Sequence, residues 1–218
     1  MNTHPTSTNN PVNDLNQPEL VGVYGKYKIT LEDKREVKFY RLSILLCALA
    51  FFSGLLHWII WGSNSAWIWL LPMAAGLGLA LKWIHIYLIP LHKALKILWA
   101  IGCTGIVLTL FKEGPENILH TFSFNPISSI AIGPFFAALT GLGIKEFFCF
   151  RRFEAIGLTI FIPIALLGHL SNVLDGAIVM ALLTLSAFLL LILSIRKFGI
   201  DASADIGDKS VFEYLKKN

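Results

Sequence analysis

Long apolar stretches alternate with short polar connectors along most of this chain. A helix needs roughly 20 mostly apolar residues to cross the hydrocarbon core of a bilayer, and the stretches are close to that length. The pattern therefore predicts an all-α, polytopic membrane protein, a bundle of six transmembrane helices within a membrane domain at 42–197. The predicted spans are residues 42–61, 66–87, 97–111, 127–144, 155–170 and 176–195.

The segments that flank the predicted bundle are polar. Residues 1–20 are rich in Asn, Pro, Thr and Ser and contain no Lys or Arg, which predicts a disordered tail rather than a signal peptide. Residues 21–41 begin with partial alternation and continue with mixed charge. They predict a short extended piece and then an interfacial helix whose bases, Arg41 among them, rest on anionic headgroups. Residues 198–218 are predicted to form a cytoplasmic tail.

Composition agrees with a membrane protein. Hydrophobic residues make up 55% of the chain and charged residues 15%, and the mean hydropathy is +0.66; a soluble domain carries about 25% charged residues. The net charge of +4 does not indicate nucleic-acid binding, because the basic residues lie at predicted helix ends. The three cysteines have no CxxC or metal-ligand spacing, and they are interpreted as small apolar side chains.

The distribution of bases predicts the topology. With six spans, 17 of the 18 Lys and Arg residues fall on one side of the membrane, and Lys112 falls on the other. Cytoplasmic loops carry an excess of Lys and Arg. The sequence therefore predicts that both termini are cytoplasmic and that the number of spans is even.

Small residues recur at helical spacing in two predicted spans. Gly133, Ala137 and Gly141 form one such stripe, and Gly76 and Ala80 form another. Stripes of this kind let a neighbouring helix approach closely. We expect packing within one subunit, with a homodimer interface as the alternative.

Few polar side chains remain as functional candidates. His57 and His169 lie near the outer ends of the first and fifth spans, with Asn172 and Asp175 just beyond. Together these groups suggest a haem, pigment or metal ligand set or a proton relay. The alternative is that both histidines are ordinary interfacial residues, since no paired-ligand spacing such as HxxxH is present.

A second group of candidates lies in the connector at 145–154. Glu146 is a candidate proton or cation carrier, and it lies beside bases that include Arg151 and Arg152. The alternative is a salt-bridged cytoplasmic loop in which Glu146 and Glu154 pair with those neighbouring bases. The chain contains no P-loop, nucleophile elbow, dinucleotide fingerprint or metalloprotease helix, so no catalytic residue is assigned.

Two stretches resemble a known family. IGPFFAALTGLGIKEFFCFRRFEAIGLTIFIPIALLGHL, at 132–170, is similar to the uncharacterised integral membrane family DUF2301, and VYGKYKITLEDKREVKFYR, at 23–41, is similar to its lead-in to the first helix. The resemblance implies a cyanobacterial or plastid context and so a plasma or thylakoid membrane. It implies no activity, substrate or cofactor.

Three functions are consistent with these features. The first is a non-catalytic accessory or assembly factor of a photosynthetic membrane, in contact with the lipid bilayer and with a larger membrane complex or further copies of itself. The second is a small-solute or ion transporter, although the spans carry few charges and show no internal repeat. The third is an intramembrane haem-, pigment- or metal-binding protein built on His57 and His169.

Overall fold

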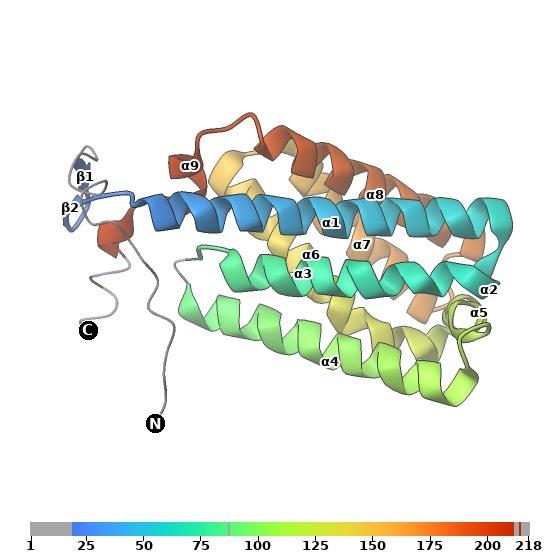
Figure 1. The fold of residues 1–218 in the computed structure, drawn as a ribbon. Coiled ribbons are helices and arrows are strands. Elements are labelled where there is room, and N and C mark those ends of the chain that lie inside the picture. The colour runs from blue at the N-terminus through green and yellow to red at the C-terminus, as the bar shows by residue number, and fades with distance from the viewer. Residues whose placement is uncertain (1–18, 87, 212–213, 215–218) are drawn as a thin grey trace, which may run out of the picture.

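The computed structural model describes residues 19–86, 88–211 and 214, and it is dominated by helices (Figure 1). Six helical segments are long and apolar enough to cross a membrane, which confirms the predicted fold class. They are α1 (Leu31–Trp61), α2–η2–α3 (Ser63–Ala66, Trp67–Trp69 and Leu70–Trp83), α4 (Ile89–Glu113), η3–α6 (Pro126–Ser128 and Ser129–Phe150), α7 (Phe153–Leu170) and α8 (Gly176–Lys197).

Shorter elements lie at the two ends of this bundle. A β-hairpin of β1 (Leu20–Gly22) and β2 (Gly25–Tyr27) precedes α1, and α9 (Ala202–Ile206) follows α8. Figure 1 shows the hairpin and α9 at one end, here called the α9 end, and α2 and α5 (Ile118–Phe124) at the other, here called the α5 end. The tail predicted at 1–20 falls almost wholly outside the described residues.

The first helix begins at a capping box. The Asp33 backbone N–H donates to the Thr30 hydroxyl at 3.2 Å, and the Thr30 backbone N–H donates to the Asp33 carboxylate at 2.7 Å. This reciprocal pair satisfies two N–H groups that a helix start otherwise leaves unpaired. From there α1 runs without interruption to Trp61, so the charged interfacial stretch and the first span form one helix.

Neighbouring spans pack as antiparallel pairs. Helix α1 packs against α3 and α8, α4 against α6, and α7 against both α6 and α8. Close approach depends on small residues: a Cβ added to Gly76 would lie 2.6 Å from the Cys47 backbone nitrogen in α1. The prediction of a close contact at Gly76 is confirmed.

The predicted stripe on α6 behaves differently. A Cβ on Gly133 would meet nothing within 4 Å, while one on Gly141 would meet the Leu95 side chain. The α4–α6 approach instead depends on Gly102 and Gly105 of α4, whose added Cβ atoms would collide with the α6 backbone. The prediction that Gly133 packs against a neighbouring helix was therefore wrong.

Helix α4 begins eight residues before the predicted third span at 97–111. Pro90 occupies its first turn, a position where the missing N–H costs nothing. The bases that follow this proline therefore belong to the first turns of α4 rather than to a connector. The helix break itself lies between Trp83 and Ile89.

Candidate functional site

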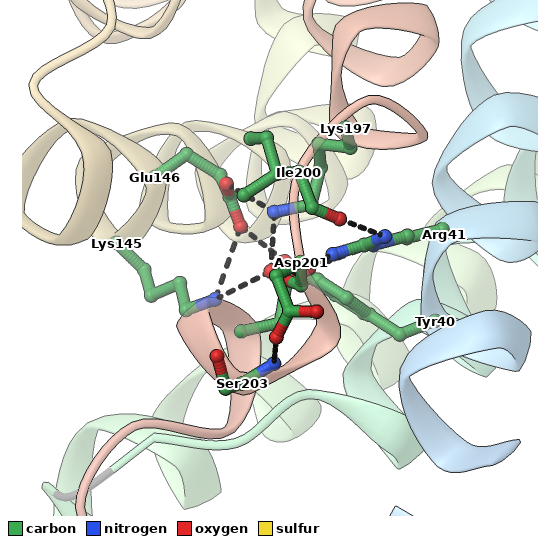
Figure 2. Close-up of polar contacts among 9 residues, drawn as sticks. Tyr40, Arg41, Lys145, Glu146, Lys197, Ile200, Asp201 and Ser203 are labelled. Carbon is green, nitrogen blue, oxygen red and sulfur yellow. Dashed lines mark hydrogen bonds and ion pairs between the residues drawn. The ribbon is translucent and has the colours of Figure 1, made fainter. Parts of the chain in front are cut away.

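Six polar side chains from four helices meet inside the α9 end (Figure 2). All are buried, and we call them the ionic cluster. Its members are Tyr40 and Arg41 of α1, Lys145 and Glu146 of α6, Lys197 of α8 and Asp205 of α9.

Glu146 lies at the centre of the cluster and is fully buried. The Lys197 Nζ donates to Glu146 Oε2 at 2.6 Å, and the Lys145 Nζ donates to Oε1 at 3.1 Å. The Tyr40 hydroxyl donates to the same Oε1. Both carboxylate oxygens of Glu146 are therefore paired, one of them twice.

Asp205 extends the network into the segment after α8. Its Oδ1 accepts from Lys197 Nζ at 2.6 Å, and its Oδ2 accepts from Arg41 Nε at 2.8 Å. Arg41 also donates to the backbone carbonyls of Ile200 at 2.8 Å and Asp201 at 3.0 Å. The expectation that Arg41 rests on lipid headgroups was wrong, because this side chain holds the 200–205 segment against the bundle.

Two aromatic rings complete the cluster. The Lys197 ammonium lies 4.3 Å from the Phe150 ring centroid and 5.1 Å from that of Tyr40. The Lys145 ammonium lies 5.4 Å and 5.0 Å from the same two centroids. Cations over aromatic faces at these distances are attracted to the ring quadrupole, and the attraction is larger when water is excluded.

The cluster is suited to holding helices together. Its three cations and two carboxylates are mutually paired, and a buried charge is tolerated when it is both paired and hydrogen-bonded. Elsewhere, the middle portions of the six described spans carry no Asp, Glu, Lys, Arg or His side chain. The described bundle therefore has no ionisable side chains at mid-depth that could line a hydrophilic path.

The predicted pairing of Glu146 with a neighbouring base is confirmed by Lys145, but the sequence did not identify its distant partners. Lys197 is 51 residues away and Tyr40 is 106 residues away, so no local spacing relates them. Glu154 pairs with Arg196 of α8 rather than with the adjacent bases. Arg151 adopts a left-handed conformation, with φ of 49°, where α6 ends, and Arg152 directly precedes α7.

The polar candidates at the α5 end have separate partners. His57 contacts the Ser65 hydroxyl through Nε2 at 2.8 Å and accepts from the Trp69 indole N–H at 3.2 Å. His169, which is buried, bonds to the Phe122 carbonyl at 2.9 Å. Among the described residues, no group of three or more metal-ligand side chains includes either ring. A cofactor shared by the two histidines remains a prediction.

Asp175 and Asn172 shape the turn between α7 and α8. The Asp175 carboxylate accepts from the backbone N–H groups of Ala177 at 2.9 Å and Ile178 at 3.0 Å, which caps α8. Asn172 adopts the left-handed conformation, with φ of 55°, a region in which Asn is enriched. Local backbone geometry therefore accounts for both residues.

His169 also lines an apolar cavity of about 120 Å³ at the α5 end. The cavity lies among α1, α3, α5, α6, α7 and α8, and its walls include Trp58, Trp69 and Met73. Sites for drug-sized ligands usually measure about 300–1,000 Å³. The cavity is therefore too small for a whole haem or pigment without rearrangement of its walls.

One group of side chains has metal-ligand geometry. Ligand atoms of Asp33, Glu36 and His85 lie within 4.8 Å of one another at the α9 end. The Lys209 ammonium already lies 2.7 Å from Asp33 Oδ2, and His85 Nε2 lies 3.3 Å from Glu36. Burial lowers the pKa of His85, and the charge of Glu36 acts in the opposite direction.

Comparison with known proteins identifies the family. Neither the curated proteins nor the solved structures include a match to this chain. The model of a family described as uncharacterized integral membrane protein matches residues 79–214, which contain four of the six spans and most of the ionic cluster. The lead-in at 23–41 lies outside the matched region. Because the match covers more than half of the chain, the protein belongs to the DUF2301 family of integral membrane proteins.

Proposed function

We propose that this protein is a non-catalytic accessory or assembly protein of a photosynthetic membrane, plasma or thylakoid, that packs against a larger membrane complex. The ionic cluster carries the proposal. Its charges are enclosed and mutually paired, so they connect α1, α6, α8 and α9 instead of presenting groups to a substrate. The cyanobacterial or plastid context rests on the resemblance of residues 132–170 and 23–41 to the family.

The distribution of polar groups supports an accessory role over transport. Transporters place ion and substrate sites near mid-depth, at broken helices and ionisable side chains. The ionisable side chains described here lie toward the ends of the spans, and α6 and α7 continue through their internal prolines. The 3-10 turn η2 that interrupts the second span lies near the start of that span rather than at its middle.

Helix α4 offers a surface for a partner. Its outward side chains are large and apolar, and Phe111 is 85% exposed and Leu108 63% exposed. Lipid contacts this surface in an isolated bundle. A partner helix would replace lipid there without leaving a polar group unpaired, because the side chains are hydrocarbon.

Site-specific photocrosslinking in native membranes tests this role. A photoreactive side chain at Ile101 of α4 is expected to form discrete adducts with one or a few membrane proteins. The matched control is Leu185 of α8, another exposed apolar position, where lipid adducts are expected. Lipid adducts alone at both positions, together with solute flux in proteoliposomes, would favour the transporter. A visible absorption band in the pure protein would favour the pigment or haem reading.

The orientation is part of the proposal. All described Lys and Arg residues except Lys112 belong to the α9 end, which supports a cytoplasmic location for that end and for both termini. Single cysteines at Asn64 and Glu116 should react with impermeant maleimide in intact cells, and one at Arg151 should not. Lys217, a fourth test position, lies outside the described residues. The protein used for this test lacks Cys47, Cys103 and Cys149. Labelling of position 151 from outside would show that the orientation is the opposite of the proposed one.

A further inference from the structure

The small-residue stripe of α6 forms the floor of a groove, although its last member, Gly141, also packs against Leu95 of α4. The groove measures about 440 Å³ and lies among α4, α6 and α7. Gly133, Ala137 and Gly141 line its floor, while leucine side chains from α4 and α7 line its sides. Its volume falls in the range of about 300–1,000 Å³ that is usual for ligand sites.

The side chain of Thr140 adds an unpaired polar group to this groove. Thr140 lines the groove and is 8% exposed, and its hydroxyl has no hydrogen-bond partner. In the described part of the chain, the Thr140 hydroxyl oxygen is the one buried side-chain polar atom without a hydrogen-bond partner. Buried polar groups are nearly always paired, so an exception calls for an explanation.

Other threonines in the spans show how such a hydroxyl is usually satisfied. Thr109, Thr159 and Thr184 each donate to the carbonyl four residues earlier, at 2.8, 2.9 and 2.8 Å. Thr140 makes no such bond, and its oxygen is covered. Threonine in a helix exchanges between two χ1 rotamers, so rotation can turn the hydroxyl toward a bound molecule.

The depth of Thr140 restricts the kind of molecule. Thr140 lies near the middle of the 22-residue α6, and therefore near the middle of a hydrocarbon core about 30 Å thick. A phospholipid keeps its ester groups at the interface and offers only hydrocarbon at this depth. A second hydroxyl, that of Ser129, lines the same groove near the start of α6.

We propose that the groove binds a slender apolar molecule that carries a carbonyl oxygen partway along its length, and that Thr140 donates a hydrogen bond to that oxygen. A carbonyl oxygen accepts this bond and brings no N–H or O–H of its own. A ligand with such a donor would leave it unpaired in the hydrocarbon surroundings. The small side chains of Gly133 and Ala137 make room for the part of the molecule that extends from the carbonyl toward the start of α6.

Binding of a long dialkyl ketone with its carbonyl at mid-chain tests the proposal. The purified protein in lipid nanodiscs is titrated with this ketone and, separately, with the alkane of equal length. The ketone should bind about fivefold more tightly, which corresponds to one neutral hydrogen bond of about 1 kcal/mol. Its infrared carbonyl band should also move to lower frequency on binding.

Two variants separate the hydroxyl from the groove. Thr140→Val keeps the side-chain shape and should reduce ketone affinity to that of the alkane while removing the shifted band. Thr184→Val, which deletes a hydroxyl already bonded to the Met180 carbonyl, is the matched control and should bind like the original protein. Gly133→Leu should fold, because its side chain enters open space, and should lose both ligands.

Three results would overturn the proposal. Equal affinity for ketone and alkane in the original protein would show a groove that holds hydrocarbon chains only. A shifted carbonyl band that persists in Thr140→Val would assign the hydrogen bond to another group. Ketone binding that survives Gly133→Leu in the folded protein would place the site elsewhere.

Discussion

The two ends of the bundle hold their polar groups in opposite ways. At the α9 end, charges from four helices are buried and paired with one another, as with Lys197 and Glu146, which are both at most 2% exposed in their side chains. At the α5 end, the ion pair of Lys112 and Glu113 is local, and the Lys112 side chain is 81% exposed. One end is joined by long-range ionic contacts, and the other by apolar packing, caps and single hydrogen bonds.

The number of charges at one end of the bundle therefore does not indicate how much each charge stabilises the fold. Water screens an exposed pair, so it contributes little. A buried pair has paid a large desolvation cost, and the loss of one partner leaves the other uncompensated. The α9 end should therefore depend on each member of its ionic cluster, while the α5 end should tolerate the loss of any single charge.

The largest expected effect comes from Lys197→Gln. This change leaves the buried Glu146 and Asp205 short of one cation each, and it should lower the free energy of unfolding by about 3–5 kcal/mol. Unfolding in mixed detergent micelles, followed by circular dichroism, measures the loss. The matched control, Lys112→Gln, should cost no more than about 1 kcal/mol. Similar losses for both variants would abolish the contrast between the ends.

The next effect concerns His169 at the α5 end. His169→Ala removes the partner of the buried Phe122 carbonyl and should cost about 1–3 kcal/mol in the same assay. His57→Ala should cost less, and the two losses should add, because the rings have separate partners.

A shared cofactor would give the opposite result. Either single change would then abolish the bound absorbance or metal, and the double variant would lose no more than one of them. His120→Ala is the control, because this ring stacks on Phe124.

The smallest expected effect comes from the α8 cap. Asp175→Ala removes the acceptor of two backbone N–H groups and should lower the free energy of unfolding by about 1 kcal/mol. Asp175→Asn keeps an acceptor oxygen and should lose much less. An equal loss in the two variants would mean that the charge of Asp175, rather than the cap, stabilises this end.

The fold class was predictable because it follows from local composition. A bilayer requires long apolar helices, and six such segments can be recognised in the sequence without any knowledge of their contacts. The family resemblance at 132–170 was also legible and agrees with the match over 79–214. The start of the third span was misplaced because the bases after Pro90 were interpreted as a connector.

The stripes of small residues could be recognised in the sequence, but the neighbours that pack against them could not be predicted. Gly76 meets the backbone of α1, whereas Gly133 faces a groove, although both belong to the same kind of repeat. Spacing places residues on one face of a helix, and it does not say which neighbour covers that face.

The number of spans, the segregation of bases to one end and the candidacy of Glu146 could all be predicted without coordinates, because each depends on residues close together in the chain. The tertiary structure alone decided that Arg41 and Asp205 complete the ionic cluster, that His57 and His169 have separate partners, and that Thr140 is buried unpaired beside a groove. These outcomes depend on how helices far apart in sequence pack. Helical periodicity fixes the direction of a side chain around its own axis, and only the packing of the bundle sets what that side chain meets.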